Sequence, residues 1–418
     1  MNELEARREK LFSLMKENSV ALFFSGVSKI SSEDEFLPFC INKNFFYLCE
    51  IEQEHSALML VKGVGEKRVY LFIDEYNELK EKWTGKRLTP EQAKLISGIE
   101  NIYTYNNFES MISLAFATEN NQYGDIDTLY LDLSPELKIG DELSTRQYKN
   151  VVEQKFPHIK VENSYPFLTQ MRMVKSPYEI ERMVKAINAT NNGIQALIKN
   201  LKPGQYEYEI ADMFEFYGRL HNRSILAFDT IVAAGKNATC LHYPTQTSMV
   251  KENDLVLFDL GYRYGQYCSD ISRTYPVSGK FEGIQRDIYT AVLNTNKAVI
   301  EYIREGMTLR ELNDFTSSFL AKECIRLGLM DKNDDIRKYY FHSVSHHLGL
   351  DTHDIGARDM HLLNGNVITV EPGLYFDKYG IGVRIEDDVL IMNGRAEVLS
   401  KDIKKEIADI ERMFALRG

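Results

Sequence analysis

Two aspartates eleven positions apart have the residue type and spacing of half a metal site. Asp259 lies in the segment Asp254–Gly261, which is apolar on both faces and therefore predicts a buried strand. An ionised carboxylate in such a strand is costly unless it is paired or bound to a metal. If the chain reverses at Tyr264-Gly265, Asp259 lies directly opposite Asp270, with Cβ atoms roughly 5 Å apart. The two carboxylates would repel each other, and a divalent cation would turn that repulsion into attraction.

The same pattern recurs near the C-terminus with two glutamates. Glu371 and Glu386 each end a short apolar segment, and a reversal centred on Lys378-Tyr379 would set them opposite each other. Strand alternation then places Arg384 on the same face as Glu386. A single buried carboxylate is usually a hydrogen-bonded structural group. Two opposed pairs in one sequence favour a metal centre instead.

Histidines gather in the same half of the chain. Four of the nine histidines lie between His342 and His353. Imidazole binds first-row metals and is also the usual acid–base group near neutral pH. His342 and His346 have the spacing of a zinc-binding helix, but the glutamate of the HExxH motif is missing, which argues against an ordinary zincin. A histidine cluster beside two carboxylate pairs favours a metal site over a set of structural histidines.

The elements that must position these residues fall into two predicted domains. Residues 1–168 alternate apolar runs with charged helical segments, which is typical of an α/β domain. The expected strands are Ser19–Ser25, His55–Val61, Arg68–Ile73 and Thr128–Leu133, and the expected helices include Glu75–Trp83 and Pro90–Ile96. Residues 169–418 form the second predicted domain. Its first long helix is predicted to begin after Ser176, which can cap the helix, with Glu179 completing a capping box.

The second domain contains a faint internal repeat. Two helices joined by a Gly-containing turn, around residues 189–212, are matched by a similar arrangement around residues 294–314. Each copy is followed by one of the acidic pairs. The repeat predicts two related halves, and the alternative is that any two helical hairpins look this similar.

Bulk composition limits the class of protein. The net charge of −11 argues against a nucleic-acid partner, which would require a basic face. No apolar run approaches the roughly 20 residues that span a bilayer, so no membrane partner is expected. The first twenty residues lack the apolar stretch of a signal peptide, and the five scattered cysteines form no CxxC pair. We therefore expect a cytoplasmic protein.

Taken in chain order, these residues resemble the creatinase/aminopeptidase family of metallopeptidases, family M24, and aminopeptidase P in particular. The metal ligands of that family are Asp, Asp, His, Glu and Glu. They match Asp259 in Phe258–Gly261, Asp270 in Ser269–Thr274, His346 in Ser345–Asp351, Glu371 in Glu371–Tyr375 and Glu386 in Arg384–Asp388. In the first domain, Asn44–Leu48 and Trp83–Leu88 resemble segments of the aminopeptidase P N-terminal domain. The resemblance implies an α+β catalytic domain of the pita-bread fold, with a pseudo-twofold repeat and a curved antiparallel sheet.

The resemblance also implies an activity. Such an enzyme releases the N-terminal residue from peptides with proline in the second position, using two divalent ions, most often Mn²⁺, with Co²⁺ or Zn²⁺ as substitutes. A hydroxide held between the metals would attack the scissile carbonyl. Glu371 would also shuttle a proton, and His242 and His353 would stabilise the tetrahedral intermediate or hold the substrate. A homodimer or homotetramer is implied by the same analogy.

Further residues are implied around the site. His342, Tyr375 and Arg384 would orient the ligands, although Arg384 could instead form a simple ion pair with Glu386 or Asp388. Trp83, the only tryptophan, would lie near a subunit contact and the site entrance, and its alternative role is a core or interface side chain. His347 stands where bacterial members of the family often carry tryptophan.

Three alternative functions are weighed against this one. A prolidase would cleave only Xaa-Pro dipeptides, and Ser345 and the Trp83 segment favour aminopeptidase P over it. A non-catalytic binding module on the same fold would have lost metal ligands, and creatinase-like C–N hydrolysis proceeds without metal. The intact set of five ligands argues against both, because buried unpaired carboxylates are costly.

Overall fold

The computed structural model describes residues 2–119, 121, 123–133, 145–222 and 225–417. The chain divides into two compact units, Met1–Met171 and Arg172–Gly418, and each is described by itself. In the described part of the chain, no helix combines the length and the apolar character needed to cross a membrane.

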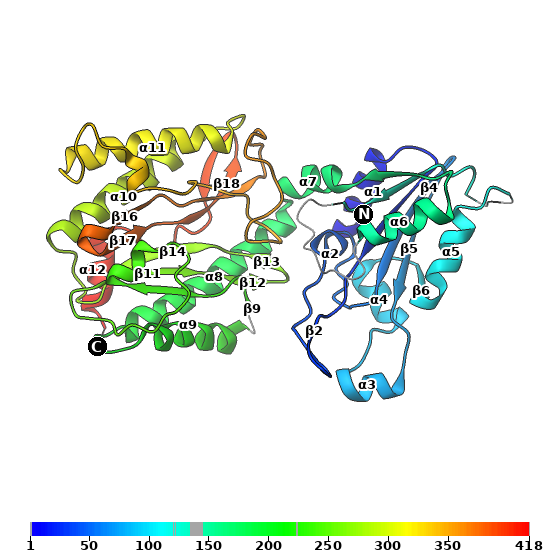
Figure 1. The fold of residues 1–418 in the computed structure, drawn as a ribbon, viewed down its shortest axis with the longest axis horizontal. Helices are drawn as coiled ribbons and strands as arrows, with labels where there is room; N and C mark the ends of the chain where they lie inside the picture. The colour runs from blue at the N-terminus through cyan, green and yellow to red at the C-terminus, as the bar shows by residue number, and fades with distance from the viewer. Residues whose placement is uncertain (1, 120, 122, 134–144, 223–224, 418) are drawn as a thin grey trace. The chain divides into compact units, whose positions relative to one another are not determined.

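The first unit is built on a six-stranded mixed sheet of order β6-β5-β4-β1-β7-β8 (Figure 1). Its strands are β1 (Ser19–Phe24), β4 (Ala57–Gly63), β5 (Glu66–Ile73), β6 (Asn101–Thr104), β7 (Thr128–Leu131) and β8 (Lys160–Asn163). Its helices are α1 (Glu3–Leu14), α2 (Lys43–Cys49), α3 (Glu78–Thr84), α4 (Pro90–Ser97), α5 (Phe108–Ala115), α6 (Thr145–Lys155) and α7 (Tyr165–Met173), and β2 (Ile30–Ser32) and β3 (Glu35–Phe36) form a separate hairpin. The strands and helices expected from the sequence are present, and apolar residues on both sheet faces explain why β1, β4 and β7 are buried, whereas the edge strands β6 and β8 are not.

The second unit contains two helix pairs and a set of antiparallel strands. The helices are α8 (Pro177–Asn200), α9 (Glu207–Asn222), α10 (Gly283–Tyr302), α11 (Leu309–Arg326) and the C-terminal α12 (Ile407–Ala415). The strands of the first half are β9 (Ile225–Leu226), β10 (Ile231–Ala234), β11 (Leu255–Leu260), β12 (Tyr262–Tyr264), β13 (Tyr267–Cys268) and β14 (Ile271–Pro276). Those of the second half are β15 (Val367–Val370), β16 (Gly373–Phe376), β17 (Ile381–Arg384), β18 (Asp387–Met392) and β19 (Arg395–Val398). In Figure 1 the pairs α8–α9 and α10–α11 flank these strands, so each half contributes one helix pair.

The capping signal at the start of α8 is confirmed. The Ser176 side chain accepts a hydrogen bond from the Glu179 backbone N–H, and the Glu179 side chain accepts one from the Ser176 backbone N–H. Pro177 occupies the first turn, where its missing N–H has no consequence.

The register of the first carboxylate hairpin differs from the expected one. Asp259 of β11 pairs with Ser272 of β14, not with Asp270. The cause is the turn: Gly265 and Gln266 both have positive φ, as a two-residue type I′ turn requires, so the reversal lies one residue later than predicted. The shift of two residues keeps the same strand face toward Asp259, because side chains alternate with period two.

The second carboxylate hairpin has the expected register but a different strand arrangement. Residue 373 pairs with residue 384, the register that sets positions 371 and 386 opposite each other. However, the predicted strand ending at Glu371 is β15, which pairs with β18, and a further strand, β16, pairs with β17 instead. Pro372 lies between β15 and β16, where it has no N–H to donate to a ladder.

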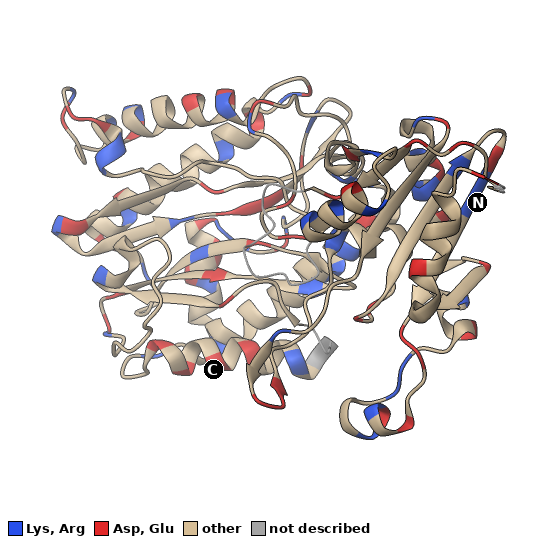
Figure 2. Ribbon diagram, turned by 45° about the vertical axis from the view of Figure 1, so that its right-hand side comes forward, with Lys and Arg blue, Asp and Glu red and all other residues tan. Residues whose placement is uncertain are grey.

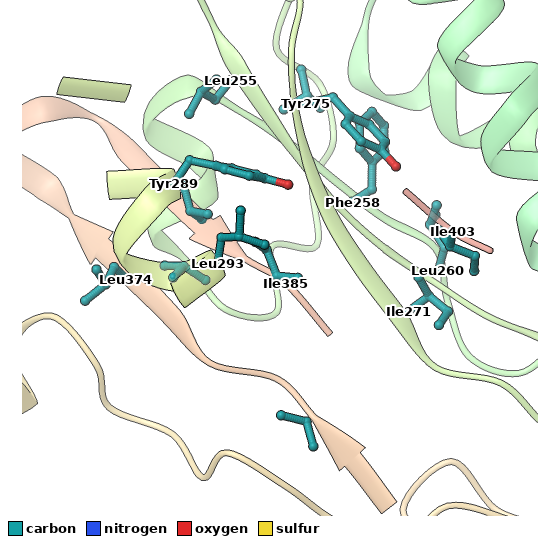
Figure 3. Packing of buried hydrophobic residues seen from close by; sticks show 14 of the residues in the cluster. Leu255, Phe258, Leu260, Ile271, Tyr275, Tyr289, Leu293, Leu374, Ile385 and Ile403 are labelled. Carbon is teal, nitrogen blue, oxygen red and sulfur yellow. The ribbon is translucent and has the colours of Figure 1, made fainter. Parts of the chain in front are cut away.

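A single hydrophobic cluster joins α10 to the strands of the second unit. Tyr289 and Leu293 on the buried face of α10 belong to the same cluster as Leu374 and Ile385 (Figure 3). The helix therefore packs directly behind the strand ends that carry the acidic residues.

Candidate metal centre

The four acidic residues of the predicted site lie in strands of the second unit or directly beside them. Asp259 lies near the end of β11, and Asp270 lies between β13 and β14. Glu371 follows β15 directly, and Glu386 stands between β17 and β18. In Figure 2 acidic segments, drawn in red, lie along these central strands as well as on the outer helices. Three of the carboxylates therefore lie where a strand begins or ends, whereas Asp259 lies within its strand.

His346 is the residue around which three of the carboxylates gather. Its Nε2 atom lies 3.4 Å from Asp270 Oδ2, 3.6 Å from Glu371 Oε1 and 4.0 Å from Glu386 Oε1. One ligand atom each of Asp270, His346 and Glu386 lie within 4.8 Å of one another, a spacing that could hold a metal ion. The segment around His346 is irregular loop, so the predicted helix-like spacing to His342 has no helix behind it.

The hydrogen bonds of the His346 ring fit a metal ligand. The Nδ1 atom lies 3.0 Å from the His347 carbonyl oxygen, which can only accept, so Nδ1 carries the proton. The lone pair of Nε2 is then directed toward the carboxylates. A metal-ligating histidine typically donates its other ring N–H to a carbonyl in this way.

Asp259 borders the same cluster and is joined to Arg384. Its Oδ2 atom lies 2.5 Å from Arg384 Nη2, while its buried Oδ1 atom has no hydrogen-bond partner. The alternative that Arg384 pairs with Glu386 or Asp388 is therefore wrong. An unsatisfied buried carboxylate oxygen beside three other carboxylates is a position for a cation.

The electrostatics of the cluster show the cost of crowding these groups without a cation. Burial raises the pKa of Asp270 well above its usual value, and the charge of Glu386 raises it further. Burial and then Glu386 do the same to the pKa of Glu371. The pKa of Glu386 rises to about 7, through burial first and then through Asp259. Four mutually repelling carboxylates and a correctly oriented imidazole are a donor set that fits divalent cations.

A directed chain of hydrogen bonds leads away from the cluster. Arg384 Nη1 donates to Tyr375 Oη at 3.1 Å, and Tyr375 Oη lies 2.9 Å from His342 Nε2. The His342 Nδ1 atom donates to the Ser343 carbonyl at 2.8 Å. Its Nε2 atom therefore carries no proton and accepts a hydrogen bond from the Tyr375 hydroxyl. Burial and then Arg384 lower the pKa of His342 to about 4, which keeps this imidazole neutral near pH 7.

Ser272 is a site residue that the sequence did not reveal. Its hydroxyl donates to Glu386 Oε2 at 2.7 Å and accepts from Arg384 Nε at 2.7 Å. It follows Asp270 by two residues and therefore shares its strand face, which is the signal that could have identified it.

The remaining predicted residues lie at different places. The His353 ring centre lies 4.3 Å from that of His346, edge to face, and burial and then His346 lower the pKa of His353. His242 is exposed, and its charge also contributes to the lowered pKa of His353. His347 is buried, and neither ring nitrogen has a hydrogen-bond partner. Trp83 belongs to α3 of the first unit and is 73% exposed.

Comparison with known proteins bears on both units. Residues 181–393 match the model of metallopeptidase family M24, and residues 4–123 match that of the aminopeptidase P N-terminal domain. The Xaa-Pro aminopeptidase of Haemophilus influenzae is 33% identical over 433 residues, which cover 99% of this chain and 97% of that protein. A structure of zinc-substituted E. coli aminopeptidase P in complex with product is 27% identical with a TM-score of 0.89, covering 100% of this chain and 98% of that one. Proline aminopeptidase P II from Yersinia pestis is 28% identical with a TM-score of 0.89, covering 100% of each chain.

The fold and the donor set define a hydrolase of the metallo-aminopeptidase class, preceded by an aminopeptidase P N-terminal domain. More narrowly, the chain belongs to metallopeptidase family M24. The predicted architecture, an α/β domain followed by an α+β pita-bread domain, is confirmed.

Proposed function

We propose that this enzyme releases the N-terminal residue from peptides that have proline in the second position. The observation that carries the proposal is the convergence of His346 with Asp270, Glu371 and Glu386 within 4.0 Å. This donor set supports metal-assisted hydrolysis. The preference for proline is supported by two relatives named Xaa-Pro aminopeptidase, each of which this chain matches over 97% of its length.

Two divalent cations are proposed as cofactors, with Mn²⁺ preferred and Co²⁺ or Zn²⁺ as substitutes. The residues that would hold them are Asp259, Asp270, His346, Glu371 and Glu386. When bound, the cations would lower the pKa of water toward neutrality and polarise the scissile carbonyl. Mostly oxygen donors with one nitrogen favour Mn²⁺ over a soft-ligand zinc site.

The protein's own residues would move the proton and hold the substrate. Glu371 lies at the edge of the cluster, where its carboxylate can take a proton from the attacking water and pass it to the leaving nitrogen. His353 and His242 would donate hydrogen bonds to the substrate carbonyl as charge develops on its oxygen. Arg384, Tyr375 and His342 would keep Asp259 in place through the chain of hydrogen bonds.

Assembly and location are proposed more broadly. We propose that residues 1–168 and 169–418 act as separate N-terminal and catalytic domains of a homodimer or homotetramer, with exposed Trp83 near a subunit contact. A cytoplasmic location is supported by the cysteine pattern, an odd number of scattered cysteines with no CxxC pair. Light scattering coupled to size-exclusion chromatography measures the oligomeric state.

A small peptide panel tests the activity. We expect metal-stripped protein reloaded with Mn²⁺ to release alanine from Ala-Pro-Ala but not from Ala-Ala-Ala, and a chelator to abolish the release. Asp270→Asn removes a proposed metal ligand. It should lower kcat/KM by at least about 100-fold, the upper end of the loss that follows when a hydrogen-bond partner of a metal ligand is removed. Asp402→Asn, an exposed acidic position, is the matched control and should behave as wild type.

The alternatives give different outcomes in the same panel. Cleavage of Ala-Pro with none of Ala-Pro-Ala would show a prolidase and contradict the proposal. Protein that takes up no metal and cleaves no peptide would instead show a binding module on this fold.

A further inference from the structure

Asn296 is a polar side chain on the apolar face of α10. It lies one turn from Val292 and one turn from Val299, and its exposed fraction is 0%. An amide group buried among apolar side chains costs free energy unless its hydrogen bonds are made. The partners of this amide therefore show what it does.

The amide uses both N–H groups on the strands that carry the glutamates. Asn296 Nδ2 donates to the Val370 carbonyl at 3.1 Å and to the Ile385 carbonyl at 3.3 Å. Its Oδ1 accepts from Lys405 Nζ at 2.7 Å. This orientation of the amide is unambiguous, since a flipped group would set its oxygen against two carbonyl oxygens and its NH₂ against an ammonium.

Each of these carbonyls belongs to the peptide unit that leads into a glutamate. Val370 directly precedes Glu371, and Ile385 directly precedes Glu386. A peptide unit is planar, so fixing its oxygen fixes the direction in which the next residue's Cα–Cβ bond departs.

The opposite edge of each peptide unit is also fixed. Glu371 N–H donates to the Val344 carbonyl at 2.8 Å, and Glu386 N–H donates to the Ser272 carbonyl at 3.0 Å. Both peptide planes are thus held at the oxygen by one shared amide and at the nitrogen by separate partners. Asn296 is the only group among these that touches both planes, which makes it the element that sets their spacing.

The amide is itself held in place by a buried ion pair. Lys405 Nζ, which donates to Asn296, also lies 2.6 Å from Asp387 Oδ2. Asp387 Oδ1 lies 2.7 Å from Arg273 Nη2, and both of these side chains are fully buried. Rotation of the Asn296 amide would break the Lys405 contact together with both strand contacts.

We infer that Asn296 is a positioning residue that fixes the separation of Glu371 and Glu386 through their preceding peptide planes. The inference rests on the proposed function, because these glutamates are the proposed metal ligands. Metal–ligand distances tolerate only about 0.2 Å of deviation, so a small change in the two planes lowers metal affinity.

Asn296→Asp tests this with little change of shape, because aspartate keeps an acceptor for Lys405 but has no N–H to donate. We expect the metal-stripped variant to bind Mn²⁺ about 10- to 100-fold more weakly in calorimetric titration. This is the usual loss when a group that hydrogen-bonds to a metal ligand is removed. Asn296→Ala, which adds no charge, should show the same loss and also serves if the aspartate variant does not fold.

Thr295→Val is the matched control. Thr295 is also fully buried on α10, but its hydroxyl donates only to the Ala291 carbonyl of the same helix, at 2.7 Å. This variant should bind Mn²⁺ as wild type does, even if its unfolding temperature falls.

Two results would overturn the inference while leaving the proposed function intact. One is unchanged Mn²⁺ affinity in folded Asn296→Asp or Asn296→Ala, and the other is an equal loss of affinity in Thr295→Val. A wild-type protein that binds no Mn²⁺ would overturn the proposed function and this inference with it.

Discussion

At the scale of single residues, the hydroxyl of Ser272 has two partners of opposite charge. It donates a hydrogen bond to the carboxylate of Glu386 and accepts one from the guanidinium of Arg384. Only a group that both donates and accepts can fill this place. Ser272 is fully buried, so water cannot replace the hydroxyl without rearrangement.

Ser272→Ala is therefore expected to weaken metal binding more than it lowers the stability of the fold. Removing the hydroxyl leaves one N–H of Arg384 and one oxygen of Glu386 unpaired, at a cost of about 1–3 kcal/mol. Mn²⁺ affinity should fall about 10- to 100-fold, measured by titration of metal-stripped protein. Ser278→Ala removes an exposed hydroxyl that bonds the backbone carbonyl and N–H of Lys280, far from the acidic cluster in sequence, and should leave Mn²⁺ affinity unchanged. Equal affinities for the two variants would contradict this role of Ser272.

A second residue-scale prediction concerns Asp354, which makes buried ion pairs with Arg172 and Lys175. Burial opposes its ionisation, but the two cations outweigh burial and lower the pKa of Asp354 to about 2. Because the folded pKa is depressed, the carboxylate adds stability above its unfolded pKa of about 3.9, and this stability is lost as pH falls toward 2.

Asp354→Asn should lower the free energy of unfolding by about 3 kcal/mol at pH 7, since it leaves buried Lys175 without its ion-pair partner, while Arg172 keeps Asp351 at 2.8 Å. Urea denaturation from pH 7 downward measures this. The difference from wild type should stay constant to about pH 5 and shrink only below it. A difference that shrinks already between pH 7 and pH 6 would show that another group is responsible.

At the scale of elements, β17 depends on a close backbone approach at Gly382. A Cβ atom there would lie 1.9 Å from the Ala238 carbonyl oxygen in η2 (Gly235–Thr239), and a backbone atom cannot move aside cheaply. Arg384 stands two residues further along the same strand, on the same face as residue 382.

Gly382→Ala is expected to destabilise the second unit by about 1–3 kcal/mol or more through overpacking, and to weaken Mn²⁺ binding by displacing Arg384. Gly394→Ala provides the comparison. Gly394 has a φ of +75° with open space around it, so alanine there costs only about 1–2 kcal/mol of backbone strain and leaves the site untouched. Thermal unfolding and metal titration of both variants separate steric displacement from strain, and equal metal affinities would contradict the prediction.

The elements were largely predictable from sequence because their signals are local. The capping box of α8 and the apolar strands of the first unit needed only short windows of residues. Chemical types and motifs also predicted His346 and the four carboxylates, and the structure brings three of these carboxylates within 4.0 Å of His346 Nε2. Hairpin register and strand pairing were less predictable, since the positive φ of Gln266 moved one turn by a residue and a further strand, β16, follows Pro372 and pairs with β17. Ser272 and Asn296 were missed because their roles arise from contacts across more than seventy residues of sequence.

At the scale of the whole molecule, the second unit folds around a cluster of like charges. Without a cation, burial and mutual repulsion raise the pKa values of Asp270, Glu371 and Glu386, so folding opposes the ionisation of these carboxyl groups. Any ligand that binds only the folded state stabilises it by mass action.

Mn²⁺ is therefore expected to stabilise the second unit specifically. At a free concentration 1,000 times its dissociation constant, one bound ion contributes about 4 kcal/mol to the free energy of unfolding. Differential scanning calorimetry should show the transition of this unit moving to higher temperature with added Mn²⁺. Asp270→Asn should abolish most of the shift, while Asp402→Asn should retain it. A shift of equal size in both variants would place the stabilising ion elsewhere.

The position of Trp83 has a consequence for spectroscopy. The chain contains one tryptophan and 24 tyrosines, and that tryptophan stands 73% exposed on a seven-residue helix without a buried side chain. Its fluorescence thus reports the polarity around α3. A blue shift of the emission as protein concentration rises would record the covering of this indole by another copy of the chain.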